Sequence, residues 1–177
     1  TLGLFTAWAI GVHTTAKLPL QILYLSYTVE IARPKSAAIK RIIESRKYQE
    51  VFPAVRLLKN VTSNEYWSID HKFAGIDNIG DEMFTLCAAG LKGSVTSKRS
   101  HLCLIDDCIK SATDIANPDI RKAMQDNWNA VISPTMFEGG RAICLGTRFR
   151  HDDIHATTFN EQNNWQQIVL SAIQTDP

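Results

Sequence analysis

The sequence predicts an α/β fold in which helices cover both faces of a mostly parallel sheet. Segments with the character of strands alternate along the chain with segments whose apolar residues recur at helical spacing. Several of the strand segments are apolar throughout, which is typical of strands buried on both faces of a parallel sheet. The 177 residues suffice for one domain with its own core, so we expect a single domain over residues 1–177.

The first elements are predicted to be a core helix and a buried strand. Apolar residues near the N-terminus fall at helical spacing, and we expect them to face the core: Leu4, Phe5, Trp8, Ala9 and Val12. The stretch is too short to span a membrane, so we expect no membrane partner. Turn residues follow at 13–19, and residues 21–27 have the pattern of a mostly buried strand.

A second helix is predicted to begin after Thr28, which can cap it, with Glu30 in its first turn. Three isoleucines at 39, 42 and 43 give this helix an apolar face. Pro34 is expected either in the first turn or at a kink, because proline has no backbone N–H to donate.

The rest of the chain is predicted to add strands and two helices. Strands are expected at 65–69, 83–90 and 102–106, a short buried strand at 142–146 after a break at 138–140, and a last strand at 165–173. Asn117 and Pro118 mark a helix start, with asparagine as the cap and proline in first position. A short helix is expected within 152–159.

The composition is that of an ordinary globular protein and shows no overall basic charge of the kind that nucleic-acid-binding proteins carry. Hydrophobic residues make up 45% and charged residues 21%, as in ordinary globular proteins. The net charge of +1 gives no global basic field, so contact with nucleic acid would need a local patch. The four cysteines form no CxxC pair, and we expect small buried thiols in a reducing compartment: Cys87, Cys103, Cys108 and Cys144.

The stretch HLCLIDDCIK, residues 101–110, places two adjacent aspartates after four apolar residues. Strand alternation predicts that Asp106 and Asp107 point to opposite faces. Ligands of open α/β sheets bind at the carboxyl ends of strands, where the chain frays into a loop and both acids could serve one site. One acid could hold Mg²⁺ through oxygen or water, and the other could orient water as a base. The alternative is a core strand that ends in water.

No phosphate-binding loop of the form GxxxxGK[ST] occurs in the sequence. The nearest stretch, 11–18, has Ala16 in place of the second glycine and Leu18 in place of the hydroxyl. The segment 90–99, GLKGSVTSKR, is rich in glycine and basic residues but has a different spacing. It is either a solvated turn or a flexible loop that contacts DNA or phosphate through backbone N–H groups and three side chains: Lys92, Lys98 and Arg99.

The stretch HDDIH places His151 and His155 four residues apart, as in the helices of zinc proteases. Asp152 stands where those helices carry glutamate, and no third ligand is evident. We therefore expect a polar helix start with acids in its first turn. A zinc enzyme is the alternative that metal analysis would dismiss.

Taken in order, four segments resemble the ATPase domain of the large terminase subunit of tailed bacteriophages: 22–53, 84–111, 142–159 and 165–173. The resemblance covers nearly all of the chain. It implies a P-loop NTPase-like fold of the ASCE/RecA type, with ATP and Mg²⁺ as cofactors. It also implies ATP hydrolysis that drives viral double-stranded DNA into a procapsid. The implied partners are the portal protein, the small terminase subunit and further copies in a homo-oligomeric ring, in the host cytoplasm on the procapsid portal.

The resemblance also implies roles for individual residues. LCLIDD resembles the Walker B strand, with Asp106 as the magnesium-associated acid and Asp107 in the catalytic position, where relatives often have glutamate. Gly146, Thr147 and Arg148 resemble the coupling motif that senses the γ-phosphate, although many relatives have a smaller residue or proline in place of Arg148. GLKGSVTSKR resembles a glycine-rich segment that precedes Walker B in these proteins.

The resemblance departs from the family at both ends. Residues 1–8 resemble the helix that follows the Walker A loop, and that loop and its strand are missing upstream. No acidic nuclease cluster follows Ile173. The chain is therefore expected to be the central and C-terminal part of a terminase ATPase domain, without the nuclease domain. Because the missing strand lies inside the sheet of P-loop folds, we expect unpaired strand edges and marginal stability or association.

Two rival functions follow from the same residues. A helicase-like or other DNA-stimulated ATPase would share the acids at the strand end. A catalytically silent protein that only binds DNA or a partner would explain the absent phosphate loop.

Overall fold

Five strands form one sheet in the order β2-β3-β1-β4-β5. The computed structural model describes residues 2–59, 63–77, 83–93, 95 and 98–170. The strands are β1 (Ile22–Ser26), β2 (Tyr66–Trp67), β3 (Leu86–Gly90), β4 (Ser100–Asp106) and β5 (Met136–Leu145). Strands β3, β1, β4 and β5 pair in parallel, and only β2 is antiparallel to its neighbour. The predicted mostly parallel α/β class is confirmed.

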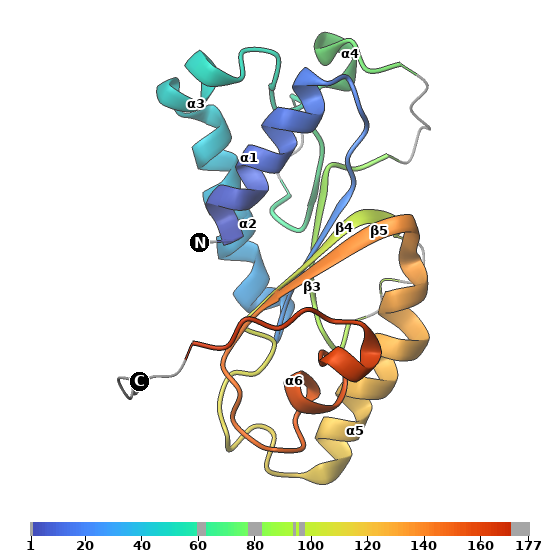
Figure 1. The fold of residues 1–177 in the computed structure, drawn as a ribbon. Helices are drawn as coiled ribbons and strands as arrows, with labels where there is room; N and C mark the ends of the chain where they lie inside the picture. Colours follow the sequence, from blue (N-terminus) through green and yellow to red (C-terminus); the bar gives the residue numbers. More distant parts are fainter. Residues whose placement is uncertain (1, 60–62, 78–82, 94, 96–97, 171–177) are drawn as a thin grey trace, which may run out of the picture.

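Helices lie on both faces of this sheet, as Figure 1 shows. The α-helices are α1 (Leu2–Thr15), α2 (Val29–Glu44), α3 (Arg46–Val51), α4 (His71–Ala74), α5 (Pro118–Asn127) and α6 (Ile154–Thr157). A π-helical turn at Trp128–Ile132 continues α5, and short 3₁₀ turns occupy Ser133–Thr135 and Glu161–Asn163. Asn117 accepts a hydrogen bond from the backbone N–H of Asp119, so the predicted start of α5 is confirmed.

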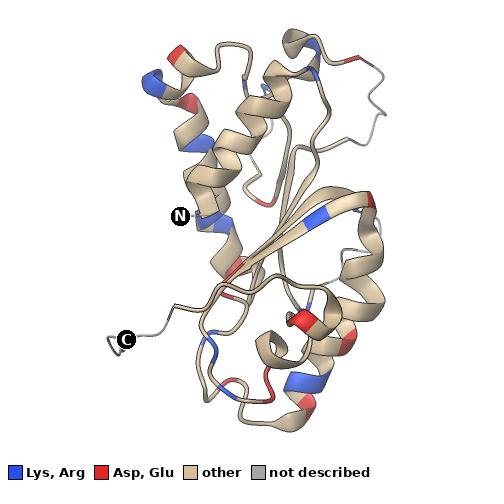
Figure 2. Cartoon of the chain, viewed as in Figure 1, with Lys and Arg blue, Asp and Glu red and all other residues tan. Residues whose placement is uncertain are grey.

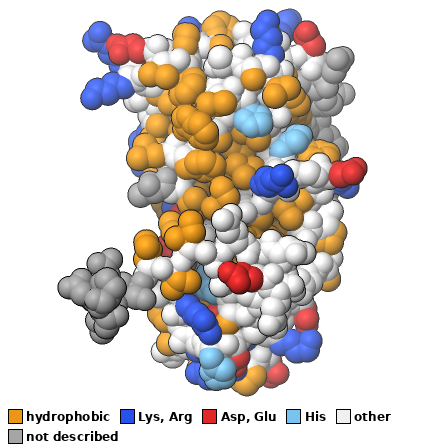
Figure 3. Space-filling view, viewed as in Figure 1, with side chains coloured by type: hydrophobic (Ala, Val, Ile, Leu, Met, Phe, Trp, Pro, Cys, Tyr) orange, Lys and Arg blue, Asp and Glu red, His pale blue; other side chains and the backbone are white. Residues whose placement is uncertain are grey.

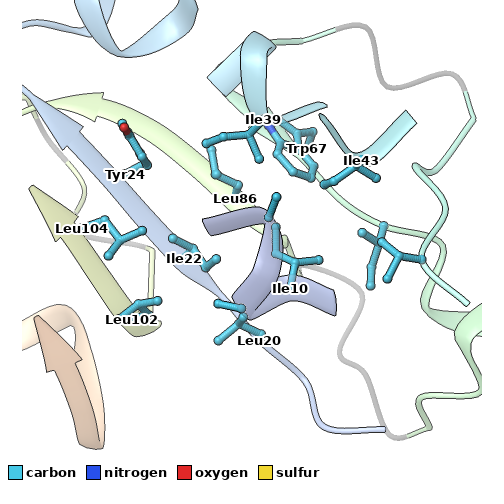
Figure 4. Close-up of a cluster of buried hydrophobic side chains, with 14 of the residues drawn as sticks. Ile10, Leu20, Ile22, Tyr24, Ile39, Ile43, Trp67, Leu86, Leu102 and Leu104 are labelled. Atoms are coloured by element: carbon cyan, nitrogen blue, oxygen red, sulfur yellow. The ribbon is translucent and has the colours of Figure 1, made fainter. Parts of the chain in front are cut away.

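Strand alternation divides the apolar residues into two core clusters. On one face, Ile22, Leu86 and Leu104 pack with Ile39 of α2 and Trp67, as Figure 4 shows. On the other face, the neighbouring strand residues pack with α5 and the π-helical turn: Leu23, Leu25, Cys103, Ile105, Met124, Trp128 and Ile132. Strands β1 and β4 are therefore buried on both faces, and this packing fixes the position of the residues at the end of β4.

The first helix forms as predicted, but the prediction of its core face is wrong. Ala9 and Phe5 contribute to the core, whereas Leu4 and Trp8 are 59% and 54% exposed. The residues buried instead include Ala7 and Ile10. Helix α1 carries no Asp, Glu, Lys or Arg, so apolar residues occur all round it and periodicity cannot select one face.

The second helix follows its prediction closely. Thr28 occupies the N-cap position, although its side chain makes no capping hydrogen bond, and Glu30 lies in the first turn. Ile39 and Ile43 are fully buried, as expected for the apolar face. Pro34 lies inside the helix beyond the first turn, so the first-turn placement is excluded.

The C-terminal strands differ from their predictions. Strand β5 continues through the predicted break at 138–140, because the extra residues form a bulge opposite β4 with Gly139 at φ +75°. It is half-exposed rather than buried, because it lies at the edge of the sheet. Residues 165–170 form no strand; residues 171–173 of that predicted strand lie outside the described residues.

Strand β4 pairs directly with β5, so the sheet is continuous from β2 to β5. An unpaired edge of the kind expected from the sequence lies along the outer side of β5, where within the described residues no sixth strand pairs. The marginal stability or association expected from it stays a prediction. A groove of about 460 Å³ between α1 and β5 opens beside this edge, lined by apolar residues that include Trp8 and Ile143. Figure 3 shows apolar side chains gathered over α1 on this face of the molecule.

Candidate functional site

Four parallel strands end at the same level and place polar residues along one edge of the sheet. Ser26 of β1 pairs with Gly90 of β3, and Asp106 of β4 pairs with Leu145 of β5. Because β1 and β4 are also neighbours in register, the two pairs form one row. Ligands of parallel sheets bind at this carboxyl edge, so the predicted location of a site is physically reasonable.

The Asp106 carboxylate is largely buried and held by two side chains. Its Oδ2 accepts a hydrogen bond from the Tyr24 hydroxyl at 2.5 Å and forms an ion pair with Lys35 Nζ at 2.9 Å. The Ser26 hydroxyl donates to the Asp106 carbonyl at 2.7 Å. Within the described residues both side-chain contacts fall on Oδ2, so Oδ1 is the oxygen left for another ligand.

Asp107 does not point away from Asp106, and the predicted opposite orientation of the two acids is wrong. Its φ of +53° is left-handed, so the alternation of the strand ends at this residue. The turn brings Asp107 Oδ2 to 3.4 Å from Lys35 Nζ, the same ammonium that binds Asp106. The Asp107 backbone N–H donates to the Leu145 carbonyl at 2.9 Å. Asp107 is 60% exposed, whereas Asp106 is 14% exposed, so the two carboxylates meet different amounts of water.

Tyr24 and Lys35, which support the acids, were not predicted from the sequence. Burial, and next the hydrogen bond to Asp106, raises the pKa of Tyr24, so its phenol stays a donor across the neutral range. Tyr24 could have been found from its place in β1, two residues before Ser26, because alternate residues share one face. No pattern in the sequence singles out Lys35 in this way. It is one of several basic residues on α2, and only the packing of α2 on the sheet selects it.

The predicted coupling residues lie beside the acids. Gly146, Thr147 and Arg148 follow β5 directly and are exposed. The pairing of Asp106 with Leu145 places this segment next to the Asp106–Asp107 turn. Arg148 Nε donates to the Arg150 carbonyl at 3.3 Å. The structure thus brings the two motifs together, and the roles predicted for Thr147 and Arg148 stay predictions.

The basic segment 90–99 does not form one patch. Lys92 and Lys98 lie on a pocket of about 600 Å³ beside the start of α2. Their ammonium groups lie over the rings of Tyr27 and Tyr66, at 5.1 and 4.4 Å. Arg99 stacks instead on Phe137, near the amino end of β5.

The reason for this separation is topological. Strands β3 and β4 are both parallel to β1, so the segment that joins them must cross the full length of the sheet. Its first residues lie at the carboxyl edge and its last residues at the amino edge. Arg99 therefore lies apart from Lys92 and Lys98, and the contact of these three side chains with DNA or phosphate stays a prediction. Figure 2 likewise shows basic and acidic residues interspersed along α2 and α5 rather than a continuous basic stripe.

The HDDIH stretch forms a helix start, as predicted, but its two acids precede the first turn of α6 rather than lying in it. Asp153 is fully buried and caps α6; its Oδ1 accepts from the backbone N–H groups of His155 and Ala156. Its Oδ2 accepts from those of Phe149 and Arg150. His151 lies outside α6 and is exposed, so the two histidines do not share a helical face.

His155 lies against two of the cysteines. The four thiols are free, and three of them are buried as predicted, whereas Cys144 is half-buried. A hydrogen bond with Cys144, opposed by burial and assisted by His155, lowers the pKa of Cys108. Burial opposes protonation of His155, but the contact with Cys108 outweighs it and raises the His155 pKa. The cysteines were predicted only as small buried hydrophobic residues, and their cluster with His155 was not predicted.

Comparison with known proteins leaves the site to be interpreted from its geometry. No protein-family model matches the chain, and no curated protein sequence matches it. None of the helices in the described part of the chain combines the length and apolar character that a bilayer crossing requires.

Proposed function

We propose that this chain is the core of the ATPase domain of a terminase large subunit, which couples ATP hydrolysis to movement of viral double-stranded DNA into a procapsid. The observation that carries the proposal is the meeting of Asp106 and Asp107 on Lys35 at the carboxyl edge of a parallel sheet, beside Gly146 and Thr147. The order of the motifs along the chain supports the same assignment.

The donor set suits a hard cation. Carboxylate oxygens are the ligands that Mg²⁺ prefers, usually one or two of them together with water and substrate phosphates. Asp106 would hold the ion through Oδ1, because Tyr24 and Lys35 occupy Oδ2. Bound ATP would supply the phosphoryl group, and its Mg²⁺ would offset the negative charge on the phosphate oxygens during transfer.

Asp107 suits the task of orienting water. It is the more exposed acid, so water reaches it, and its turn directs it to the same side as Asp106. A base works within hydrogen-bond reach of the attacking water. Lys35 fixes both carboxylates relative to each other and balances part of their charge.

The phosphate loop must come from residues other than these 177, because the sequence contains no such pattern. The open edge of β5 is where a strand bearing it would pair. Figure 1 shows α1 running alongside the sheet with its first turn toward the side where β5 ends. A loop that joins a strand on β5 to α1 would therefore lie near Asp106 and Thr147.

Asp107→Asn, in the intact terminase subunit that the proposal implies, tests the catalytic assignment. Asparagine keeps the shape and tolerates the left-handed turn, but it cannot accept the proton of water. We expect ATP turnover to fall about 10²- to 10⁴-fold while nucleotide binding is retained. Asp126→Asn, an exposed helix residue, is the control and should keep wild-type turnover. Wild-type turnover in Asp107→Asn would refute the assignment.

A second candidate is a silent protein that binds DNA or a partner, and the absent phosphate loop favours it. Titration of the intact subunit with a fluorescent ATP analogue separates the two. Tight Mg²⁺-dependent binding excludes the silent protein, and no binding supports it. A requirement for procapsid or portal would distinguish a packaging motor from a helicase-like ATPase.

A further inference from the structure

Two thiols and one imidazole from three separate segments meet beneath the carboxyl edge of the sheet. Cys108 Sγ lies 3.6 Å from His155 Nε2, and Cys144 Sγ lies 3.7 Å from His155 Nδ1. One ligand atom from each of the three residues lies within 4.8 Å of the others. Cys108 follows β4, Cys144 belongs to β5, and His155 lies in the first turn of α6. The cluster is therefore a product of the fold.

The spacing matches a soft metal ion. Zinc binds cysteine sulfur at about 2.3 Å and histidine nitrogen at about 2.0–2.1 Å in a tetrahedral arrangement, so its ligand atoms lie roughly 3.5–3.8 Å apart. The imidazole now presents one nitrogen to each sulfur, and a small rotation of its ring would direct a single nitrogen at a shared ion. We propose that Cys108, Cys144 and His155 form a zinc site.

The surroundings favour such a site. Cys108 is fully buried, and Cys144 and His155 are half-buried, so the ligands are held by packing rather than by solvent-exposed side chains. Two thiolates and a neutral imidazole balance the charge of a divalent zinc ion. Three protein ligands leave a fourth position for water or another ligand, as in sites that keep an open position.

The backbone fixes the histidine. Asp153 Oδ1 accepts the His155 backbone N–H at 3.1 Å, which holds the first turn of α6. His155 also packs closely on Gly146, where an added Cβ would lie 2.8 Å from the imidazole Cε1. A metal bound here would link Cys108, which follows Asp107, to Cys144, which lies two residues before Gly146. Zinc would therefore fix the spacing of the two motifs, whether or not the chain hydrolyses ATP.

Cobalt titration of the reduced chain tests the site, because tetrahedral Co²⁺ bound by thiolate absorbs strongly in the visible and near ultraviolet. We expect one Co²⁺ per chain, displaced by an equivalent of Zn²⁺. Cys108→Ser and His155→Gln should lose more affinity than the roughly 10- to 100-fold that changes around metal ligands cost. Circular dichroism of each variant in the absence of metal shows whether it is folded.

Matched controls come from the same chain. His151→Gln alters the exposed histidine of the same stretch, and Cys87→Ala removes a buried thiol on β3; both should bind Co²⁺ like the wild type. Absence of thiolate–cobalt absorption in the reduced wild-type chain would overturn the proposal. This holds even if Cys108 and Cys144 prove able to form a disulfide on oxidation. Unchanged binding by folded His155→Gln would overturn it too.

Discussion

One backbone torsion decides how the two aspartates are arranged. With φ at +53°, Asp107 leaves the strand geometry, and its carboxylate meets the ammonium that binds Asp106. Aspartate visits this left-handed region more readily than most residues, because its short polar side chain can hydrogen-bond locally. The sequence DD thus permits the turn, and the bond from the Asp107 N–H to Leu145 stabilises it.

Tyr24→Phe tests the support of Asp106. The variant removes a partly buried hydrogen bond to a charged group, so we expect the unfolding free energy at neutral pH to fall by about 1.5–3 kcal/mol. Tyr27→Phe is the control, because the Tyr27 side chain lies at the surface of the large pocket. Urea denaturation measures both. Equal stability of Tyr24→Phe and wild type would show that the bond contributes nothing.

The same residue predicts a pH dependence. The folded pKa of Tyr24 is raised, so its contribution is complete below the unfolded pKa of about 10 and is lost as the pH rises above it. Tyr24→Phe lacks this ionisation. We expect the stability difference between wild type and variant to shrink above pH 10 in denaturation series, whereas a constant difference would contradict the assignment.

At the scale of elements, close contact between β3 and the start of α2 shapes the edge of the sheet. A Cβ on Gly90 would lie 2.9 Å from Thr28 Cα and 3.0 Å from the Val29 nitrogen, both backbone atoms that cannot rotate away. The glycine at the end of β3 therefore lets α2 approach the sheet. This approach in turn delivers Lys35 to the acids.

Gly90→Ala should accordingly destabilise the chain by about 1–3 kcal/mol, as overpacking does. Gly3→Ala is the matched control: its Cβ would meet only Ile39 Cγ1 at an ordinary 3.8 Å, and alanine favours helix by about 0.5–1 kcal/mol. Thermal unfolding of the two variants measures the contrast. A stable Gly90→Ala variant would mean that α2 can shift without cost.

At the scale of the whole molecule, the groove between α1 and β5 joins an apolar surface to an unpaired strand edge. Both features favour association, because the edge offers unpaired backbone groups and the surface is hydrophobic. The proposed phosphate-loop strand would cover both. The chain by itself should therefore associate as its concentration rises.

Light scattering over a concentration series measures this association. Trp8→Glu, on the exposed face of α1, should shift the chain toward the monomer. Val51→Glu changes another exposed apolar residue outside the groove and should associate like the wild type. A wild-type chain that stays monomeric and unfolds cooperatively would contradict the prediction.

The sequence by itself determined the α/β class, the strands β1, β3 and β4, and the start of α5, because long apolar runs and an Asn-Pro cap are local signals. It also located Asp106, Asp107, Gly146 and Thr147 at strand ends. It could not select the buried face of α1, because apolar residues surround that helix. The last predicted strand is wrong: Trp165 packs on the core, but residues 166–170 remain exposed and pair with no strand of the sheet.

Only the tertiary structure decided which side chains meet. The ion pair of Asp106 with Lys35 and the contact of His155 with Cys108 join residues far apart in sequence. Conversely, Arg99 lies away from Lys92 although the two are close in sequence. Such contacts depend on the register of β4 against β5 and on the path of long connections. The local sequence pattern does not predict the register or the path, because both are set by how the elements pack.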